Sequence, residues 1–517
     1  MKDDHKKKDD NLLAVTVNDV SFEYDIHSLV KAFYPACEVR VFGTEEGDEQ
    51  FVNEQVAREN SARERNSSGE GLPDIDIRFL EDAILISVVV AGEEGNSFQV
   101  QKIALSENME RPDIKNSLKQ LLYAALSEHT KKTLPWGSLT GIRPTKIPMA
   151  LLEEDAEEAD ILDYMQNVYL LSQEKASLAL EIAKKERKLL SGLDQEKGYS
   201  LYIGIPFCPT TCLYCSFTSY PIVSWKKRVG EYLDALDKEI DFLAEEYQHM
   251  QLETVYIGGG TPTTLTEQEL DRLFNKLKDS LDFSHVKEFT VEAGRADSIT
   301  PEKLAVMKRY GVTRISVNPQ SMNQKTLDLI GRKHTVEQVK EAFLMAREAG
   351  FDNINMDLIL GLPGEEAEDV KRTLEEIKAL KPDSLTVHSL AVKRASRLSQ
   401  WIEENGMESF HNTEETMQIA MDGAVQMGME PYYLYRQKNM AGNFENVGYA
   451  AEGKEGLYNI LIMEEKQTIA ALGAGSISKR IFPDGRIERC DNVKDVDLYI
   501  QKIDEMIQRK RNLLLEK

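Results

Sequence analysis

Short apolar runs alternate with helix-length amphipathic segments through the middle of this chain. Six runs rich in β-branched and aromatic residues, from YSLYIGI to DSLTVHSL, lie between residues 199 and 390, and all but the last precede an amphipathic segment. This repeated unit favours a parallel sheet with right-handed crossovers, either an open doubly wound sheet or part of a (β/α) barrel. The sequence therefore predicts an α/β core at residues 197–410, with functional residues in the loops after the carboxyl ends of the strands.

The regions on either side of this core have different patterns. Residues 1–110 contain four strand-like runs interrupted by the polar stretch 43–71, which has the composition of a flexible insertion, so we expect a small α+β domain. Residues 111–196 have helical periodicity and predict a helical bridge. Residues 411–517 mix a helix, short strands and the Gly-rich segment ALGAGSIS, and we expect an α+β extension that packs against the sheet.

The balance of charged residues narrows the expected partners. The chain has 63 Lys and Arg against 88 Asp and Glu, a formal net charge of −25. Because such a field repels polyanions, binding to nucleic acid or to an anionic membrane is not expected. The N-terminus MKDDHKKKDD is not followed by a signal-like apolar stretch, and no run of about 18 apolar residues occurs, so a cytoplasmic location is expected.

Three of the five cysteines lie within eight positions, in the segment CPTTCLYCSF that follows the first predicted strand. Cys208, Cys212 and Cys215 can hold an iron–sulfur cluster at three corners and leave one iron open to a small molecule. Two other interpretations remain, namely a structural zinc ion completed by a distant histidine and ordinary buried cysteines. A reducing compartment would keep these thiols available as ligands.

The spacing Cys-x3-Cys-x2-Cys, with an aromatic residue before the third cysteine, resembles that of the radical S-adenosylmethionine (SAM) superfamily. Four ordered segments, YIGIPFCPTTCLYCSF, YIGGGTPT, RISVNPQSMNQKTLDLIGRKHT and MDLILGLPGE, are similar to the motifs of the oxygen-independent coproporphyrinogen III oxidases (coproporphyrinogen dehydrogenases) and their paralogues. The resemblance covers about residues 199–480. The N-terminal domain with WGSLTGIRPTKI resembles that of the longer, second oxidase-like subgroup of this family.

This resemblance implies a partial (β/α)6 radical-SAM barrel whose cofactors are a four-iron, four-sulfur (4Fe-4S) cluster and S-adenosyl-L-methionine. Cys208, Cys212 and Cys215 would ligate the cluster, and its open iron would bind the amino and carboxylate groups of SAM. The positions that match family contacts to SAM are Tyr202, Tyr214, Gly259, Gly260, Thr261, Glu292, Gln320, Arg332, Asp357 and Ile477. Taken without the resemblance, the glycines fit a plain turn, Glu292 a solvated strand end and Arg332 a surface helix.

The same resemblance implies an oxidoreductase of porphyrin and haem biosynthesis. A deoxyadenosyl radical would take a hydrogen from each reacting propionate of coproporphyrinogen III, which loses carbon dioxide and becomes a vinyl group of protoporphyrinogen IX. An electron-donor protein such as a flavodoxin or ferredoxin is the expected partner. Because the substrate is a tetracarboxylate, it needs local cations, for which the candidates are Lys393, Arg394 and Arg397, with Arg436 and Lys438 behind them. A solvated helix face is the other interpretation of these cations.

The sequence departs from the family pattern in two segments. The established oxidases have a further cysteine two positions after the third, where this chain has Phe217, as in the haem-chaperone branch of the family. The His-Asn-x-x-Tyr-Trp signature of that branch corresponds to GNFENVGYA, which keeps Asn446 and Tyr449 without the His or the Trp. Three functions therefore stay open: a coproporphyrinogen dehydrogenase, which we favour, a haem-binding chaperone, and a non-enzymatic zinc-binding or regulatory protein.

Overall fold

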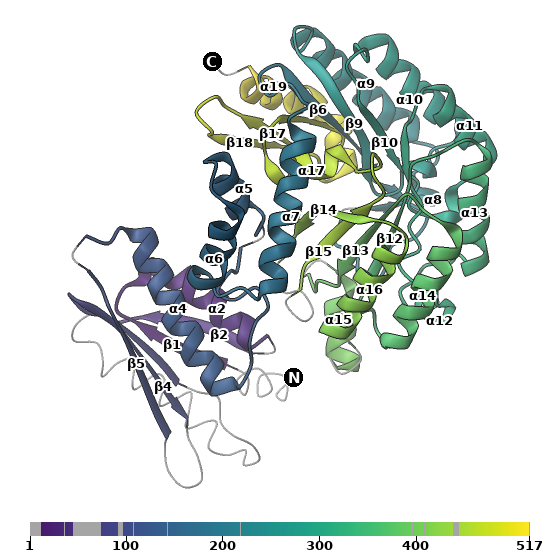
Figure 1. Cartoon of the computed structure of the whole chain (residues 1–517). Helices are drawn as coiled ribbons and strands as arrows, with labels where there is room; N and C mark the ends of the chain where they lie inside the picture. Colours follow the sequence, from purple (N-terminus) through teal and green to yellow (C-terminus); the bar gives the residue numbers. More distant parts are fainter. Residues whose placement is uncertain are drawn as a thin grey trace, which may run out of the picture. The chain divides into compact units, whose positions relative to one another are not determined.

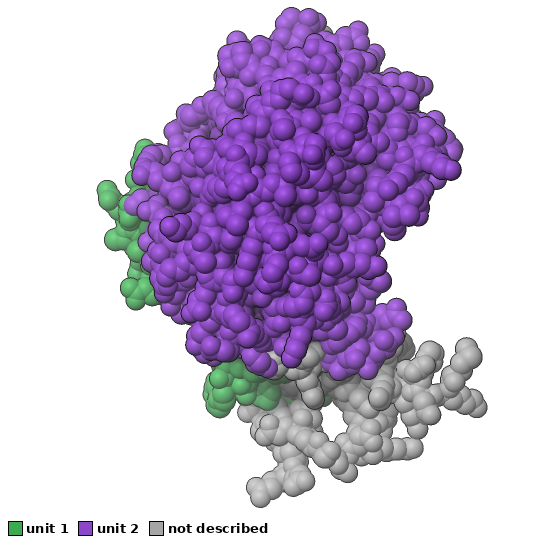
Figure 2. Space-filling model, turned by 90° about the vertical axis from the view of Figure 1, so that its right-hand side faces the viewer, with its two compact units in different colours: residues 1–180 green, residues 181–517 purple. Residues whose placement is uncertain are grey.

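The computed structural model divides the chain into two compact units, residues 1–180 and residues 181–517 (Figures 1 and 2). The finer boundaries expected near residues 110, 196 and 410 stay a prediction. Most of the polar stretch 43–71 lies outside the residues that the structure describes, and so do Arg394 and Lys438. The described residues are 12–35, 37–44, 74–90, 97–106, 108–141, 143–217, 219–393, 396–406, 410, 412–437 and 444–515.

The first unit contains a five-stranded sheet in the order β2-β1-β3-β4-β5. Strand β1 pairs in parallel with β2 and β3, whereas β3, β4 and β5 are antiparallel. Their apolar residues form one core with two helices, α2 and α4. Strand β5 was not predicted, because SFQVQKIA has only a weak apolar alternation. The elements are β1 (Leu12–Val17), α2 (Glu23–Phe33), β2 (Glu38–Gly43), β3 (Asp74–Phe79), β4 (Ala83–Val90), β5 (Ser97–Ala104), α4 (Arg111–Thr130), α5 (Lys146–Glu153) and α6 (Glu158–Val168), followed by α7 (Gln173–Leu190), which continues into the second unit.

The second unit is built on an eleven-stranded sheet in the order β14-β15-β13-β12-β11-β10-β9-β6-β16-β17-β18. Its six central strands coincide with the six predicted runs and pair in parallel throughout. Their side chains are almost continuously buried, as is typical of a parallel sheet covered by helices. These strands are β6 (Gly198–Ile205), β9 (Gln251–Gly259), β10 (Glu288–Glu292), β11 (Arg314–Ser316), β12 (Ile354–Leu360) and β13 (Ser384–Ser389).

Amphipathic helices connect these strands and lie on the outer side of the curved sheet (Figure 1). In α10, for example, Leu270, Phe274 and Leu277 are buried, and Thr266 forms a capping box with Glu269 at the amino terminus. The repeated strand–helix order agrees with the predicted partial (β/α)6 barrel. The connecting helices are α9 (Val229–Glu246), α10 (Glu267–Ser280), α11 (Pro301–Arg309), α12 (Gln324–Leu329), α13 (Val336–Glu348) and α14 (Ala367–Leu380).

The last hundred residues extend the sheet at both of its edges. Strand β15 pairs antiparallel with β13 and with β14, whereas β16 pairs in parallel with β6 at the other edge and leads into the hairpin β17–β18. Two short strands, β7 (Phe207–Cys208) and β8 (Tyr220–Pro221), flank the cysteine loop and precede α8 (Ile222–Trp225). The remaining elements are α15 (Arg397–Asn405), α16 (Glu414–Gln426), β14 (Glu430–Tyr435), β15 (Asn446–Ala450), α17 (Leu457–Glu464), β16 (Thr468–Leu472), β17 (Ile477–Ile481), β18 (Ile487–Asp491), α18 (Val496–Gln501) and α19 (Ile503–Leu514).

A buried ion pair ties the C-terminal helix to α9. The Nζ atom of Lys510 lies 2.6 Å from Oε1 of Glu239, and both side chains are completely buried. The carboxylate of Glu239 also accepts hydrogen bonds from the backbone N–H of Gly473 at 2.7 Å, from Asn492 Nδ2 at 2.9 Å and from the Tyr499 hydroxyl at 2.5 Å. These four donors satisfy a carboxylate that would otherwise be costly to bury.

None of the helices in the described part of the chain combines the length and the apolar character that a membrane span requires.

Candidate active site

A cavity of about 470 Å³ opens at the carboxyl ends of the central strands. Loops after β6, β9, β10, β11 and β13 line it, together with residues of the strands β12, β14 and β15 and of α17. Two predicted site residues, Tyr202 and Ile477, are not among its lining residues. The structure brings the other eleven together, namely Cys208, Cys212, Tyr214, Cys215, Gly259, Gly260, Thr261, Glu292, Gln320, Arg332 and Asp357.

The cysteine loop is fixed to its neighbours by backbone and side-chain bonds. Strand β7 pairs with β8, which closes the base of the loop. The N–H of Leu213 donates to the carbonyl of Ile330 at 2.9 Å, and the Thr210 hydroxyl donates to the carbonyl of Gly331 at 3.1 Å. The loop is therefore held against the segment that follows α12, in which Arg332 lies.

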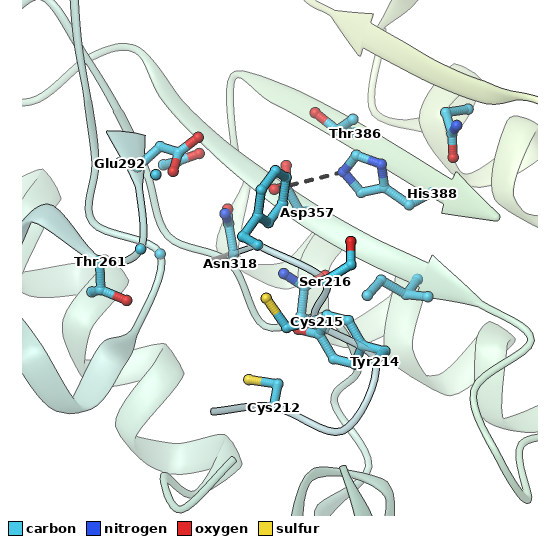
Figure 3. Close-up of a pocket in the computed structure, with 18 of the residues that line it drawn as sticks. Cys212, Tyr214, Cys215, Ser216, Thr261, Glu292, Asn318, Asp357, Thr386 and His388 are labelled. Atoms are coloured by element: carbon cyan, nitrogen blue, oxygen red, sulfur yellow. Dashed lines mark ion pairs between the residues drawn. The ribbon is translucent and has the colours of Figure 1, made fainter. Parts of the chain in front are cut away.

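The three thiols share one wall of the cavity. The sulfur atoms of Cys212 and Cys215 face the same side of the cavity (Figure 3). Thr261 Oγ1 donates to Cys208 Sγ at 3.5 Å, and Arg295 Nη1 lies 3.8 Å from Cys212 Sγ. Burial, reinforced by the neighbouring thiols, raises the pKa of Cys215 to about 11 and also raises that of Cys208.

The chemistry of this donor set fits an iron–sulfur cluster. Within the described ranges, no three His, Cys, Asp or Glu side chains are arranged to hold a single metal ion. A four-iron cluster does not require that arrangement, because each thiolate binds a different iron. Three thiols at one wall of a cavity leave one iron without a protein ligand, and metal binding would displace the protons that burial favours. Cys208, Cys212 and Cys215 would therefore hold the cluster.

The glycine loop after β9 is hydrogen-bonded directly to the end of β6 and to β7, the segment that leads into the cysteine loop. The N–H groups of Gly260 and Thr261 donate to the carbonyls of Ile205 and Phe207, both at 2.7 Å. A Cβ atom on Gly260 would meet the Phe207 carbonyl oxygen at 2.6 Å, so only glycine permits this approach. Gly259 has a φ of +103°, which also favours glycine. Both glycines thus have a structural use in addition to the predicted contact with SAM.

Tyr202 lies behind the cavity wall, in a stack of aromatic rings. Its ring centroid is 6.2 Å from that of Tyr256 and 6.1 Å from that of Tyr458, with the planes nearly parallel. The Tyr256 hydroxyl donates to Oε1 of Glu292, which lines the cavity. Burial raises the pKa of Glu292 to about 7, although the bond from Tyr256 opposes this shift. Tyr202 therefore does not line the cavity itself but packs against Tyr256, which does.

A chain of polar side chains crosses the ends of β12, β13 and β14. His388 Nε2 lies 3.7 Å from Asp357 Oδ2, as Figure 3 shows, and the Tyr435 hydroxyl is 3.4 Å from His388 Nδ1. Asn355 Nδ2 donates to Asp357 Oδ1 at 2.7 Å. Burial has the largest effect on the pKa of Asp357 and raises it, but His388 and Asn355 outweigh burial and leave that pKa below its usual value. Asp357 therefore presents a carboxylate to the cavity.

Gln320 and Arg332 add hydrogen-bonding groups to the same cavity. Gln320 has a backbone φ of +67°, which is uncommon for residues other than glycine, and its buried Oε1 has no hydrogen-bond partner in the described part of the chain. Asn318 Oδ1 is likewise buried without a partner. Arg332 Nη1 donates to the carbonyls of Asn318 at 2.5 Å and of Gly294 at 3.3 Å, and the guanidinium also interacts with Tyr214 and Cys212. Its Nε has no partner among the described residues. Unsatisfied buried groups in a cavity are suited to a polar ligand.

The structure separates the predicted substrate cations. Lys393 lines the cavity. Arg397, at the first turn of α15, donates instead to the carbonyl of Thr211 in the cysteine loop. Arg436 is buried and is not a lining residue, and burial lowers its pKa to about 10 despite the opposing charge of Glu445. The expected cluster of cations is thus reduced to Lys393 among the described candidates.

Ile477, the last predicted site residue, lies apart from the residues that line the cavity. Ile477 is the first residue of the β17 strand, where its side chain is 46% exposed outside the cavity lining. Its segment follows β16, whose pairing with β6 could not be predicted from the local pattern.

Several cavity residues were not predicted. Four of them could have been found from the sequence, because polar residues at alternate positions interrupt strands that are otherwise apolar. They are Tyr256, Asn355, Thr386 and His388. In β12 and β13 this alternation directs successive polar side chains to one face of the sheet. Arg295 lies in an irregular segment after β10, where no local pattern identifies it.

Comparison with known proteins agrees with this geometry. Residues 202–377 match the model of the radical SAM superfamily, whose members use a 4Fe-4S cluster and SAM. The oxygen-independent coproporphyrinogen-III oxidase-like protein HemZ of Bacillus subtilis is 42% identical over 402 residues, which cover 77% of this chain and 80% of HemZ. The heme chaperone HemW of the same organism is 33% identical over 281 residues, 54% of this chain and 70% of HemW.

A solved structure supports the fold independently. The coproporphyrinogen III oxidase HemN of Escherichia coli, described as a radical SAM enzyme, is similar with a TM-score of 0.50 and 22% identity, covering 62% of this chain and 72% of HemN. At this identity the likeness shows the fold alone. Together with the extent of the similarity to HemZ, these findings show that the chain belongs to the oxygen-independent coproporphyrinogen-III oxidase-like family of the radical SAM superfamily.

Proposed function

We propose that this protein converts coproporphyrinogen III to protoporphyrinogen IX without oxygen. The observation that carries the proposal is that one cavity is lined by the three thiols, by Glu292 and Asp357, and by Lys393. A cluster, its cosubstrate and the end of a propionate chain could therefore meet in one enclosure. The family membership and the name of the relative HemZ support the same substrate class.

When bound, the cluster and SAM supply a deoxyadenosyl radical, formed with one electron from a donor protein such as a flavodoxin or ferredoxin. The reacting propionate loses one hydrogen atom, and then carbon dioxide and one electron to an acceptor, which leaves a vinyl group. The protein's own contribution is orientation and exclusion of water. Asp357, Gln320 and Arg332 would bind SAM, and Lys393 would pair with a propionate.

The test is an anaerobic assay with reconstituted protein, coproporphyrinogen III, SAM and a reductant. We expect deoxyadenosine and vinyl products to form together. Lys393→Met should raise the substrate concentration for half-maximal rate more than it alters uncoupled SAM cleavage. Lys371→Met, which removes an exposed lysine of α14, is the matched control and should leave both unchanged.

A haem chaperone is the second candidate, and one observation favours it. Phe217 lines the cavity and is 72% exposed, at the position where the established oxidases are expected to have a further cysteine. If SAM is cleaved without a vinyl product, even with an efficient electron donor, while haem binds stoichiometrically, the decarboxylase proposal fails and the chaperone replaces it.

A further inference from the structure

Arg295 contacts the cysteine loop from the segment that follows β10. Its side chain is almost completely buried, and its Nη1 lies 3.1 Å from Thr210 Oγ1 and 3.8 Å from Cys212 Sγ. It lies outside the four sequence segments that resemble the oxidase motifs. A buried guanidinium beside a sulfur of the predicted cluster site therefore remains without an assigned role.

An ion pair with Asp297 fixes the orientation of this guanidinium. Its Nε and Nη2 donate to the two carboxylate oxygens of Asp297 at 3.0 and 2.8 Å, on the side away from Cys212. His334, which is completely buried, has its Nδ1 3.8 Å from Asp297 Oδ1, beyond the distance of a hydrogen bond. The order His334, Asp297, Arg295, Cys212 thus places the positive group next to the sulfur and the negative group farther away.

We propose that Arg295 is a positioning residue that raises the reduction potential of the cluster bound through Cys212. Reduction adds one negative charge to the cluster, and a nearby cation with an N–H directed at a ligand sulfur stabilises the reduced form more than the oxidised form. This effect matters in a chain with a net charge of −25, whose overall field opposes the entry of an electron. The role concerns the cluster itself and holds for a decarboxylase and a chaperone alike.

The experiment is a redox titration of the reconstituted holoprotein, with the reduced cluster followed by electron paramagnetic resonance. At the wild-type midpoint potential, Arg295→Met should lower the ratio of reduced to oxidised cluster by about tenfold, which is about 59 mV for a one-electron couple. Arg295→Lys keeps the charge without the fork of N–H groups, so its midpoint potential should lie between those of the wild type and of Arg295→Met. Iron content and sulfide content are measured for each variant, so that potentials are compared only at equal loading.

Two control variants separate this role from anchoring of the loop. Arg397→Met removes a guanidinium that also bonds the loop, at the Thr211 carbonyl, and should leave the potential unchanged. Thr210→Val removes the acceptor at 3.1 Å from Arg295 and keeps the charge beside Cys212, so the potential should also stay near that of the wild type. A shift in either control as large as that of Arg295→Met would overturn the proposal.

An unchanged potential in a fully loaded Arg295→Met protein would contradict the proposal directly. If that variant does not hold iron, the loaded Arg295→Lys protein decides in the same way. Loss of iron in both variants would assign Arg295 a purely structural role in holding the loop and would equally overturn the proposed effect on potential.

Discussion

The hydroxyl of Tyr256 donates a hydrogen bond to Oε1 of Glu292 at the edge of the cavity. The tyrosine comes from β9 and the glutamate from the next strand of the sheet, β10. The bond favours the ionised carboxylate, but burial outweighs it and raises the pKa of Glu292 to about 7. Around neutral pH, the Glu292 carboxyl of the folded protein therefore carries a proton for part of the time.

This pKa predicts how stability depends on pH. Between the unfolded value of about 4.5 and the folded value of about 7, the folded state binds more protons at this residue than the unfolded state does, so its contribution to stability falls as pH rises. Relative to Glu292→Gln, the free energy of unfolding of the cluster-free wild-type protein should fall by at most about 1.4 kcal/mol per pH unit across this interval. Above the folded-state pKa the difference should stay constant. Urea unfolding at pH 5, 6, 7 and 8 checks this, and parallel pH profiles of the two proteins would contradict it.

Replacing Cys212 with Ala should abolish cluster binding. The expected iron content of the reconstituted wild type is about four per chain, with a spectrum of the reduced cluster that SAM perturbs. Cys490→Ala is the matched control, because this cysteine is in β18, away from the cysteine loop, and should keep the full iron content. Iron and sulfide analysis with visible absorption measures both. Full loading of Cys212→Ala would show that this cysteine is not a ligand.

Asp357→Asn should weaken SAM binding without loss of iron. The substitution removes a partly buried negative charge that His388 and Asn355 maintain, and the loss of one charge-assisted hydrogen bond costs about 1–3 kcal/mol. Equilibrium binding of SAM to the loaded protein measures the effect. Asp352→Asn, at an exposed position just before β12, should bind as the wild type does. Equal affinity in all three proteins would remove Asp357 from the SAM site.

Gly260→Ala should disturb the cysteine loop. A methyl group at this position would lie 2.6 Å from the Phe207 carbonyl oxygen. The two backbone hydrogen bonds from the glycine loop to the carbonyls of Ile205 and Phe207 therefore cannot both persist. We expect a loss of about 1–3 kcal/mol in unfolding free energy and lower iron loading. Gly230→Ala in α9 meets no atom and should be neutral or stabilising by up to about 1 kcal/mol. Similar behaviour of the two variants would argue against the clash.

Lys510→Met should be strongly destabilising, because it leaves the carboxylate of Glu239 buried without its cation. Breaking such a pair costs about 3–5 kcal/mol. Lys502→Met removes an exposed partner of Glu505 and should cost less than about 1 kcal/mol. Denaturant unfolding compares the two. In the double variant Glu239→Gln/Lys510→Met, part of the loss should be recovered, and a further additive loss would contradict this account.

Local patterns were sufficient to predict the central strands and the position of the cysteine loop. Buried parallel strands have nearly continuous apolar runs, and each amphipathic helix between them has its own periodicity. The spacing of Cys208, Cys212 and Cys215 identified the loop itself. These features depend only on residues that are close together in the sequence, so one sequence is enough to recognise them.

Contacts between distant segments were not predictable in the same way. Arg397 donates to Thr211, and Arg295 reaches Cys212, although nothing in the segments around either arginine indicates these partners. Ile477 was expected at the site, but it lies in β17, between β16 and β18, and outside the cavity lining. A long charged side chain can reach several partners, and only the tertiary fold selects one of them.

The pairing of β6 has a consequence for the order of events on the ribosome. This strand leads into the cysteine loop and has β9 on one edge and β16 on the other. β9 is synthesised soon after β6, whereas β16 is made much later, after the other central strands of the sheet. Until then, β6 has an unpaired edge, which makes a nascent or truncated chain prone to aggregate. We therefore expect products that end before residue 468 to be recovered without iron.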